Sequence, residues 1–145
     1  MNIKRQKTNA ILQFLPFALF FILGTFYFFG FTSYIFFYQE KSTLFMVSLA
    51  HLYEHINQPG GFLTYLGEMQ TSFYFYPLAG AVIVAFEICA VIFILTEISA
   101  KLSKYKNFFL PFIIGGLLFY LQTNYQYSAF NNLGILLQLL LFNGV

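Results

Sequence analysis

Charge is scarce in this 145-residue sequence, and its scarcity excludes whole classes of protein. Only 8% of the residues are charged and aspartate is absent, whereas an ordinary soluble domain is about 25% charged. A water-soluble fold with so few charges could not cover its surface. Most of the basic residues lie at the amino end and in one later loop, so no basic surface for nucleic acid is expected.

Cysteine is also scarce, because Cys89 is the only one. An intrachain disulfide and a zinc site built from several cysteines are therefore excluded. A cleaved leader is not expected either. The basic cluster Lys4–Lys7 precedes an apolar stretch that continues through Tyr38 without an Ala-x-Ala site, whereas a signal peptide has an apolar core of only about 7–15 residues. We interpret the amino end as an uncleaved membrane anchor.

Long apolar runs are what the sequence does contain. Residues 8–39 and 107–145 include no charged side chain, and uncharged apolar runs longer than about 18 residues are typical of membrane spans. We therefore expect an all-α fold: a polytopic α-helical membrane protein in which residues 1–145 form a single membrane domain with three to four transmembrane helices. The expected spans are residues 11–37, 77–95, 108–121 and 130–142.

The last of these runs is short. It has about 13 residues, and at ~1.5 Å per residue it does not cross a hydrocarbon core of ~30 Å. We therefore expect the chain to be the amino-terminal part of a longer protein.

The basic residues predict the orientation. Lys4–Lys7 precede the first span, Lys101–Lys106 lie between the second and third, and basic loops face the cytoplasm. We expect a multi-pass protein of the inner (plasma) membrane, embedded in the lipid bilayer, with its amino terminus in the cytoplasm. Residues 38–76 then form an outer interfacial segment.

Within the outer segment we expect two short helices joined by a sharp turn. A helix over 43–57, capped by Ser42 or Thr43, has apolar and polar residues on opposite faces, as an interfacial helix does. Gln58–Gly61 suits a type II turn with Gly60 at positive φ. A helix over 62–71 and an aromatic band at 73–76 should follow.

His51 and His55 are candidate metal ligands. With Glu54 they form the H-x-x-E-H pattern of the inverzincin metalloproteases, in which helical spacing places two imidazoles on one zinc ion and the glutamate activates water. A third ligand is also needed, and the only nearby outer carboxylate is Glu68, beyond the turn. The simplest interpretation is that Glu54 and the two histidines form the water-facing side of an interfacial helix. We therefore assign no metal and no cofactor.

Glu54 and Glu68 are also the candidate catalytic residues of the outer segment, each as a general base. The remaining outer carboxylate, Glu40, precedes Lys41, and an exposed pair of this kind contributes little stability. If a reaction takes place in the outer segment, we expect one of these carboxylates to be its base.

Glu87 lies near the centre of the second expected span, where an ionisable side chain is costly and points to a function by default. It is a candidate proton relay. No Lys or Arg lies within any expected span, so we expect the carboxyl to be uncharged. The alternative is structural, with Glu87 hydrogen-bonded to Gln138 or to a helix outside this chain.

Three segments carry a resemblance to a known family. Gln58–Gly67 (QPGGFLTYLG), Thr71–Phe73 and Pro77–Ala81 (PLAGA) resemble the signature of a domain-of-unknown-function family of bacterial inner-membrane proteins. Its members typically have Pro-Gly-Gly-Leu, Tyr-Leu-Gly and Gln-Phe-Phe elements before Pro-x-x-Gly-Ala. The sequence departs from that pattern at Met69–Ser72. The resemblance covers most of the chain and implies a longer polytopic protein, but no reaction.

A looser similarity, of architecture only, is to membrane glycosyltransferases that use lipid-linked sugars. It suggests the membrane module of a cell-envelope glycosyl or lipid-linked group transferase, with Glu54 or Glu68 as base. One alternative is a non-catalytic scaffold that packs on other membrane helices or subunits through its small-residue stripe, Ala81, Ala85 and Cys89. The other is a proton-linked transport component that uses Glu87. The sequence leaves open whether the protein is an enzyme.

Overall fold

A computed structural model describes residues 2–43, 45–46, 48–102 and 109–144, with side chains from residue 14 onward except residue 129. All regular structure within these ranges is helical, which confirms the all-α prediction. The elements are α1 (Asn2–Gly30), α2 (Ser33–Ser42), α3 (Leu49–Ile56), α4 (Gly61–Ser72), the 3-10 helix η1 (Phe73–Phe75), α5 (Pro77–Leu102), α6 (Phe109–Gln122) and α7 (Ala129–Gly144).

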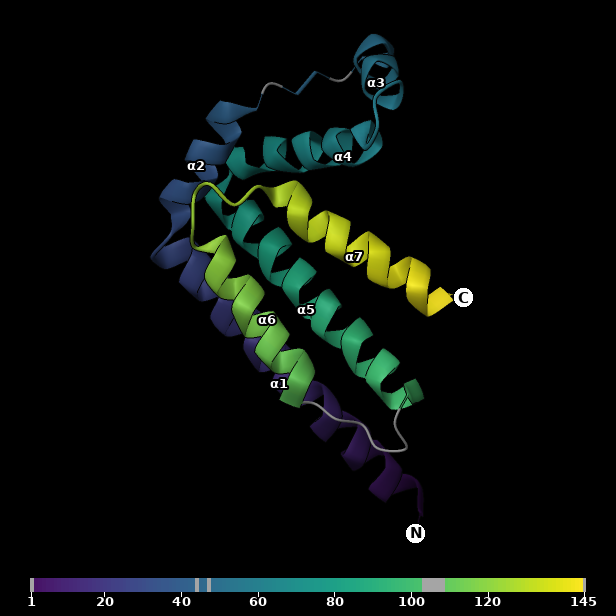
Figure 1. The fold of residues 1–145 in the computed structure, drawn as a ribbon. Helices are drawn as coiled ribbons and strands as arrows, with labels where there is room; N and C mark the ends of the chain where they lie inside the picture. The colour runs from purple at the N-terminus through teal and green to yellow at the C-terminus, as the bar shows by residue number, and fades with distance from the viewer. Residues whose placement is uncertain (1, 44, 47, 103–108, 145) are drawn as a thin grey trace.

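Helix α5 is the centre of the molecule. It packs against α1, α6 and α7, while α4 crosses the end of this group above α7 and carries α3 at its far end (Figure 1). Gly115 permits the approach of α6, because a Cβ there would lie 2.3 Å from Ile92 Cδ1. The buried apolar core is centred on α5 and includes Val84, Ile88, Val91 and Ile92, with Phe28, Phe36, Tyr74 and Leu118 from the surrounding elements.

The first expected span, residues 11–37, is not one continuous helix. Helix α1 ends at Gly30, α2 begins at Ser33, and the two are bent by 72°. Thr32 between them has φ −125° and ψ 19°, outside the helical region, and its hydroxyl donates to the carbonyl of Phe28 at 3.4 Å. Glycine at the end of α1 and a hydroxyl that bonds the backbone locally both favour ending a helix. The predicted continuity was therefore wrong.

The other expected spans correspond to single helices. Helix α5 extends to Leu102 rather than 95, and it is the one described helix that is long and apolar enough to cross a membrane by itself. The bent pair formed by Phe14–Gly30 and Ser33–Ser42 meets the same criterion only when taken together, which gives two candidate spans at most. Helices α6 and α7 are apolar but shorter.

The small-residue stripe of α5 is covered by α1. Ala81 and Ala85 are buried, and a Cβ on Gly24 would lie 3.6 Å from the Cβ of Ala85. The thiol of Cys89 donates to the carbonyl of Phe17 at 3.8 Å. The stripe is thus occupied by α1 within the chain, which is the close helix approach that small residues permit.

The segment between α2 and α5 differs from expectation at its start. Helix α3 begins at Leu49, and its cap is Ser48, whose hydroxyl accepts from the backbone N–H of His51 at 3.1 Å. Ser42 and Thr43, the predicted caps, instead donate to the carbonyl of Gln39 at 2.8 and 3.1 Å. Hydroxyls can cap the end of a preceding helix as readily as the start of the next, so the cap was misplaced.

The turn and the aromatic band that follow match the prediction only in part. Gly60 has φ 75° and ψ 0°, and the N–H of Gly61 donates to the carbonyl of Gln58 at 3.0 Å, as predicted for a type II turn. Phe73, Phe75 and Tyr76 are exposed, but Tyr74 is fully buried and its ring packs against Phe36. One of the four aromatic residues is therefore a core residue.

Candidate metal centre

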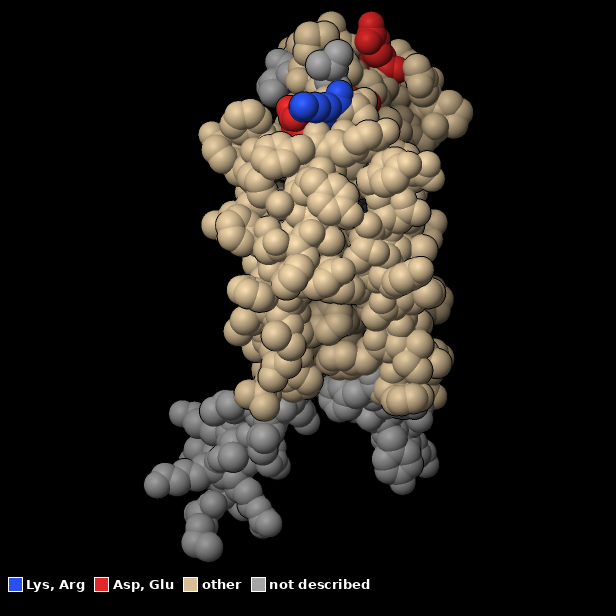
Figure 2. All heavy atoms as spheres, turned by 90° about the vertical axis from the view of Figure 1, so that its left-hand side faces the viewer, with Lys and Arg blue, Asp and Glu red and all other residues tan. Residues whose placement is uncertain are grey.

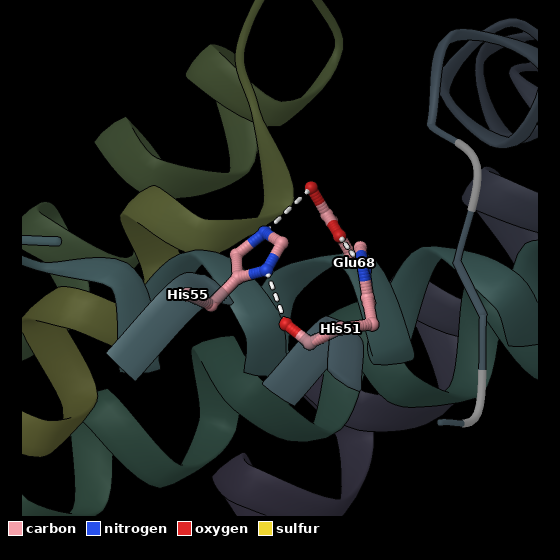
Figure 3. A group of neighbouring side chains, drawn as sticks. All are labelled: His51, His55 and Glu68. Carbon is pink, nitrogen blue, oxygen red and sulfur yellow. Dashed lines mark hydrogen bonds and ion pairs between the residues drawn. The ribbon is translucent and has the colours of Figure 1, made fainter. Parts of the chain in front are cut away.

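The hairpin of α3 and α4 brings three of the predicted site residues together: His51, His55 and Glu68 (Figure 3). The turn makes this possible because its backbone is so close to α3. A Cβ on Gly61 would lie 1.7 Å from the carbonyl oxygen of His55, so only glycine fits. The same carbonyl accepts from the N–H of Gln58 at 3.0 Å.

Helix α4 is in turn held against α7. A Cβ on Gly67 would lie 2.6 Å from the Cβ of Phe130, so the two helices approach to backbone contact. Gly67 immediately precedes Glu68 in the sequence. The position of the Glu68 carboxylate is therefore set by the packing of α4 on the rest of the molecule as well as by the hairpin.

The carboxylate of Glu68 bridges the two imidazoles. Its Oε2 lies 3.0 Å from Nε2 of His51, and its Oε1 lies 3.5 Å from Nε2 of His55. The ring centroids of the two histidines are 4.4 Å apart, as expected for positions one helical turn apart on the same face.

The hydrogen bond on the far side of His55 determines which nitrogen faces Glu68. Nδ1 lies 2.9 Å from the carbonyl oxygen of His51, and a carbonyl only accepts, so Nδ1 carries the proton. Nε2 then points a lone pair at the carboxylate unless it is protonated or bound to a metal. A histidine that donates its other N–H to a backbone carbonyl is the usual arrangement around a protein metal ion.

The surroundings of His55 favour its protonated form when no metal is bound. The hydrogen bond to the carbonyl of His51 is the main cause, and the charges of Glu68 and Glu54 add to it. Together they raise the pKa of His55 above its ordinary value of 6.5, although partial burial acts in the opposite direction. A metal ion at this site would compete with that proton.

The cluster is sheltered without being enclosed. The side chains of His51, His55 and Glu68 are 14%, 17% and 21% exposed. The ring of Tyr65 lies about 6 Å from both imidazoles, at 6.0 and 6.1 Å, and Phe45 lies 6.0 Å from His51. Aromatic rings beside the site reduce the access of water, while the remaining exposure leaves a route for a ligand.

The three side chains are close enough to bind one tetrahedral metal ion if they draw together around it. One ligand atom from each of the three side chains can be chosen so that all lie within 4.8 Å of one another. Donor atoms around a tetrahedral Zn²⁺ are about 3.3 Å apart, from bond lengths of about 2.0–2.1 Å. The separations of 3.0 and 3.5 Å run from the two imidazoles to different oxygens of Glu68, so the carboxylate can offer an oxygen to a metal ion held by either histidine.

The other predicted site residues lie apart from this cluster. Glu54 is exposed on α3 and affects His55 only through its charge. Glu40 is at the end of α2. Glu87 is buried on α5, where it faces Gln70 and Asn132, whereas Gln138 is exposed. Of the two partners considered for Glu87, Gln138 is therefore not the one that it faces.

The contributions of Tyr65 and Ser48 were missed in the sequence. Ser48 caps α3 three residues before His51, and a cap at that spacing could have been recognised. Tyr65 lies one turn before Glu68 on α4, but its approach to the histidines depends on the angle between two helices, which the sequence does not specify.

Comparison with other proteins yields one family. A search of curated proteins and a search of solved structures each gave no match. A family model described as a family of unknown function, DUF6057, matches residues 7–145. The match covers nearly the whole sequence, including the α3–α4 hairpin and every helix that packs around it. The chain therefore belongs to the DUF6057 family.

Proposed function

We propose that this chain is an integral membrane protein that binds one divalent transition metal ion, Zn²⁺ foremost, at the bilayer surface through His51, His55 and Glu68. The observation that carries the proposal is the bridging of two imidazole Nε2 atoms by one carboxylate, at 3.0 and 3.5 Å. Two histidines and a glutamate are the ligand set of catalytic zinc sites, which keep a fourth position for water or substrate.

The apolar exterior of the helices supports the membrane location. Between the charged end near α2 and the lower edge of the described atoms, the face seen in Figure 2 shows no charged side chain. Exposed apolar residues of this size and number are unusual on a soluble monomer. They include Leu19, Ile22, Leu23 and Phe26 on α1, Phe86 and Phe93 on α5, and Ile113 and Leu117 on α6.

The same pattern supports a multi-pass arrangement, which we place in the inner membrane with the amino terminus in the cytoplasm. In this arrangement α5 and the bent pair α1–α2 cross the bilayer. The shorter helices α6 and α7 add one or two further membrane segments, and α3 and α4 lie at the outer surface. The basic residues at the amino end and Lys101 in the last turn of α5 then face the cytoplasm.

The metal centre changes the role proposed for each carboxylate. Glu68, a candidate base in the sequence, becomes a ligand. Glu54 remains the candidate base because it precedes the ligand His55 and is exposed. A metal ion at this position would supply a polarised water or a Lewis acid. The reaction class that we propose is hydrolysis or group transfer on a substrate held at the bilayer surface, such as a lipid-linked sugar or other lipid-linked group.

Metal binding is tested on the purified chain in detergent after removal of metal with a chelator. Isothermal titration with Zn²⁺ should give one site per chain, and Co²⁺ should give the visible absorption of a tetrahedral nitrogen–oxygen site. Glu68→Gln should weaken binding at least about tenfold, because a ligand is lost. Glu40→Gln, which removes a carboxylate outside the cluster, is the matched control and should bind normally. Equal affinities of the two variants would refute the site.

A further inference from the structure

A second polar cluster lies within the helices, apart from the metal centre. It contains Glu87 of α5, Gln122 at the end of α6, Asn132 in the first turn of α7, and Gln70 of α4. All four are buried, with residue exposures of 5%, 1%, 1% and 6%. Four elements therefore each direct one polar side chain into an otherwise apolar interior.

The cluster is connected by hydrogen bonds. Nδ2 of Asn132 donates to Oε1 of Gln122 at 3.0 Å, and Nε2 of Gln70 donates to the hydroxyl of Tyr74 at 2.8 Å. The side chains of Gln70 and Asn132 both reach the carboxyl of Glu87. The carboxyl is thus held between α4 on one side and α7 on the other.

Some polar atoms of the cluster nevertheless have no hydrogen-bond partner within the part of the chain that the structure describes. They are Oε2 of Glu87, Oδ1 of Asn132 and Nε2 of Gln122. A buried polar atom without a partner is costly. If Glu87 is ionised, Oε2 and Oδ1 are both acceptors and neither can satisfy the other. If Oε2 carries a proton, it becomes a donor, and the cluster then holds one unpaired acceptor in place of two.

Neighbouring charges do not favour an ionised carboxyl. The titratable side chains that respond to the charge of Glu87 are Tyr74 of η1 and Tyr127 of the α6–α7 connection. Helices α1, α6 and α7 bring no acidic or basic residue within their described side chains. On α4, Glu68 is turned toward α3. On α2, Glu40 and Lys41 lie in its last turn.

We infer that Glu87 is a proton-binding site, occupied by a proton while α4 and α7 are packed on α5 and emptied when they separate. On release, the O–H bond at Oε2 breaks, its electron pair remains on the oxygen, and the proton passes to water admitted between α4 and α7. The resulting carboxylate is stabilised by that water and by the amides of Gln70 and Asn132. Proton release is therefore linked to movement of the two helices that bracket the site.

This arrangement is suited to a proton-linked step. Buried carboxyls that exchange a proton with water serve as proton relays in pumps and transporters. The inference does not rest on the metal centre. Glu87 and Glu68 lie on different helices and have different neighbours, so either site can be present without the other.

Infrared spectroscopy of the chain in lipid nanodiscs tests the inference directly, because a protonated carboxyl has a C=O stretch that is separate from those of carboxylates and amides. The chain contains five acidic residues, all glutamate. A variant with Gln at positions 40, 54, 68 and 97 retains Glu87 alone. At neutral pH it should show the protonated-carboxyl band, and Glu87→Gln in the natural chain should remove that band.

An alkaline titration then tests the link to helix movement. Loss of the band should coincide with faster hydrogen exchange of α4 and α7 amides, while the exchange of α6 stays unchanged. Absence of the band at neutral pH would overturn the inference. So would a band that appears only when Na⁺ is removed, because that result would identify a cation site. If the four-Gln variant does not fold, the natural chain with ¹³C-labelled glutamate provides the same test, with Glu87→Gln as its reference.

Discussion

Nδ1 of His55 donates to the backbone carbonyl of His51 at 2.9 Å, within a single turn of α3. This bond fixes the tautomer of His55 and aims Nε2 at Glu68, 3.5 Å away. A hydrogen bond within α3 thereby determines which nitrogen of His55 faces the carboxylate of Glu68 on α4. The pH behaviour of the site follows from this relationship.

Metal affinity should fall as the pH is lowered. The pKa of His55 is raised above 6.5 by the His51 carbonyl and the nearby carboxylates, and a metal must displace the proton that His55 then holds. The apparent Zn²⁺ affinity should decrease by about tenfold for each unit of pH below that raised pKa, the limit for competition with one proton. Competition titrations with a chromophoric chelator from pH 6 to pH 8.5 measure it. A pH-independent affinity would contradict the assignment of His55 as a ligand.

In the metal-free protein, the pairing of α3 with α4 should be more stable at low pH than at high pH, the reverse of the pH dependence of metal affinity. Because the pKa of His55 is raised in the folded state, the ion pair with Glu68 stabilises the hairpin fully below about pH 6.5. That contribution is lost as the pH rises through the raised pKa. Hydrogen exchange of the α3 amides in the presence of a chelator should therefore be faster at pH 8.5 than at pH 6, after correction for the intrinsic rate.

With excess Zn²⁺, hydrogen exchange of the α3 amides should instead be slower at pH 8.5 than at pH 6. The metal then replaces the proton as the bridge between His55 and Glu68. The control is the chain carrying Glu68→Gln, in which α3 exchange should lose its response to metal. It should also lose part of its dependence on pH, because the His51 carbonyl still raises the pKa of His55 when the Glu68 charge is gone. If that variant keeps the full pH dependence, the pairing of α3 with α4 does not depend on the ion pair.

Gly61→Ala should abolish the metal site while leaving the helices around α5 folded. The added Cβ would lie 1.7 Å from the carbonyl oxygen of His55, and backbone cannot move aside as a side chain can, so the hairpin must open. We expect Zn²⁺ affinity to fall by more than about tenfold, with little change in circular dichroism. Gly116→Ala is the control, because a Cβ there meets nothing within 4 Å; its affinity should equal that of the natural chain.

The sequence predicted the helical fold and the α3–α4 hairpin because both follow from local patterns. Apolar runs without charge give helices, and Gly60 is at the position where a type II turn needs positive φ. The break after Gly30 sets the direction of α2, and the burial of Tyr74 depends on how Phe36 of α2 then packs on η1. Such tertiary contacts are not encoded in periodicity, which is why the first span was predicted as continuous.

The candidate site was predictable in its parts but not in its assembly. The spacing of His51 and His55 places both on one helical face, and Glu68 was identified as the one carboxylate within reach. Whether Glu68 would meet them depends on the angle of the hairpin, which the contact at Gly61 determines. For Glu87, its burial was predicted, but its partners on α4 and α7 come from elements distant in the sequence, so Gln138 was named in place of Asn132.

The contact between α4 and α7 should position the metal ligand Glu68. Gly67→Ala places a Cβ 2.6 Å from the Cβ of Phe130 and 3.3 Å from its Cα, too close to the α7 backbone for a rotamer change to relieve. We expect a loss of about 1–3 kcal/mol in the free energy of unfolding, as for other overpacked interiors, and weaker Zn²⁺ binding because Glu68 moves with α4. Gly134→Ala lies at the same helix pair, but its Cβ would meet only the Cδ2 of Leu63, at 3.2 Å, which can rotate away. Thermal unfolding and Zn²⁺ titration should therefore show a larger loss of stability and of affinity in Gly67→Ala than in Gly134→Ala. Equal losses in the two variants would show that the approach of α4 to α7 does not position the metal ligands.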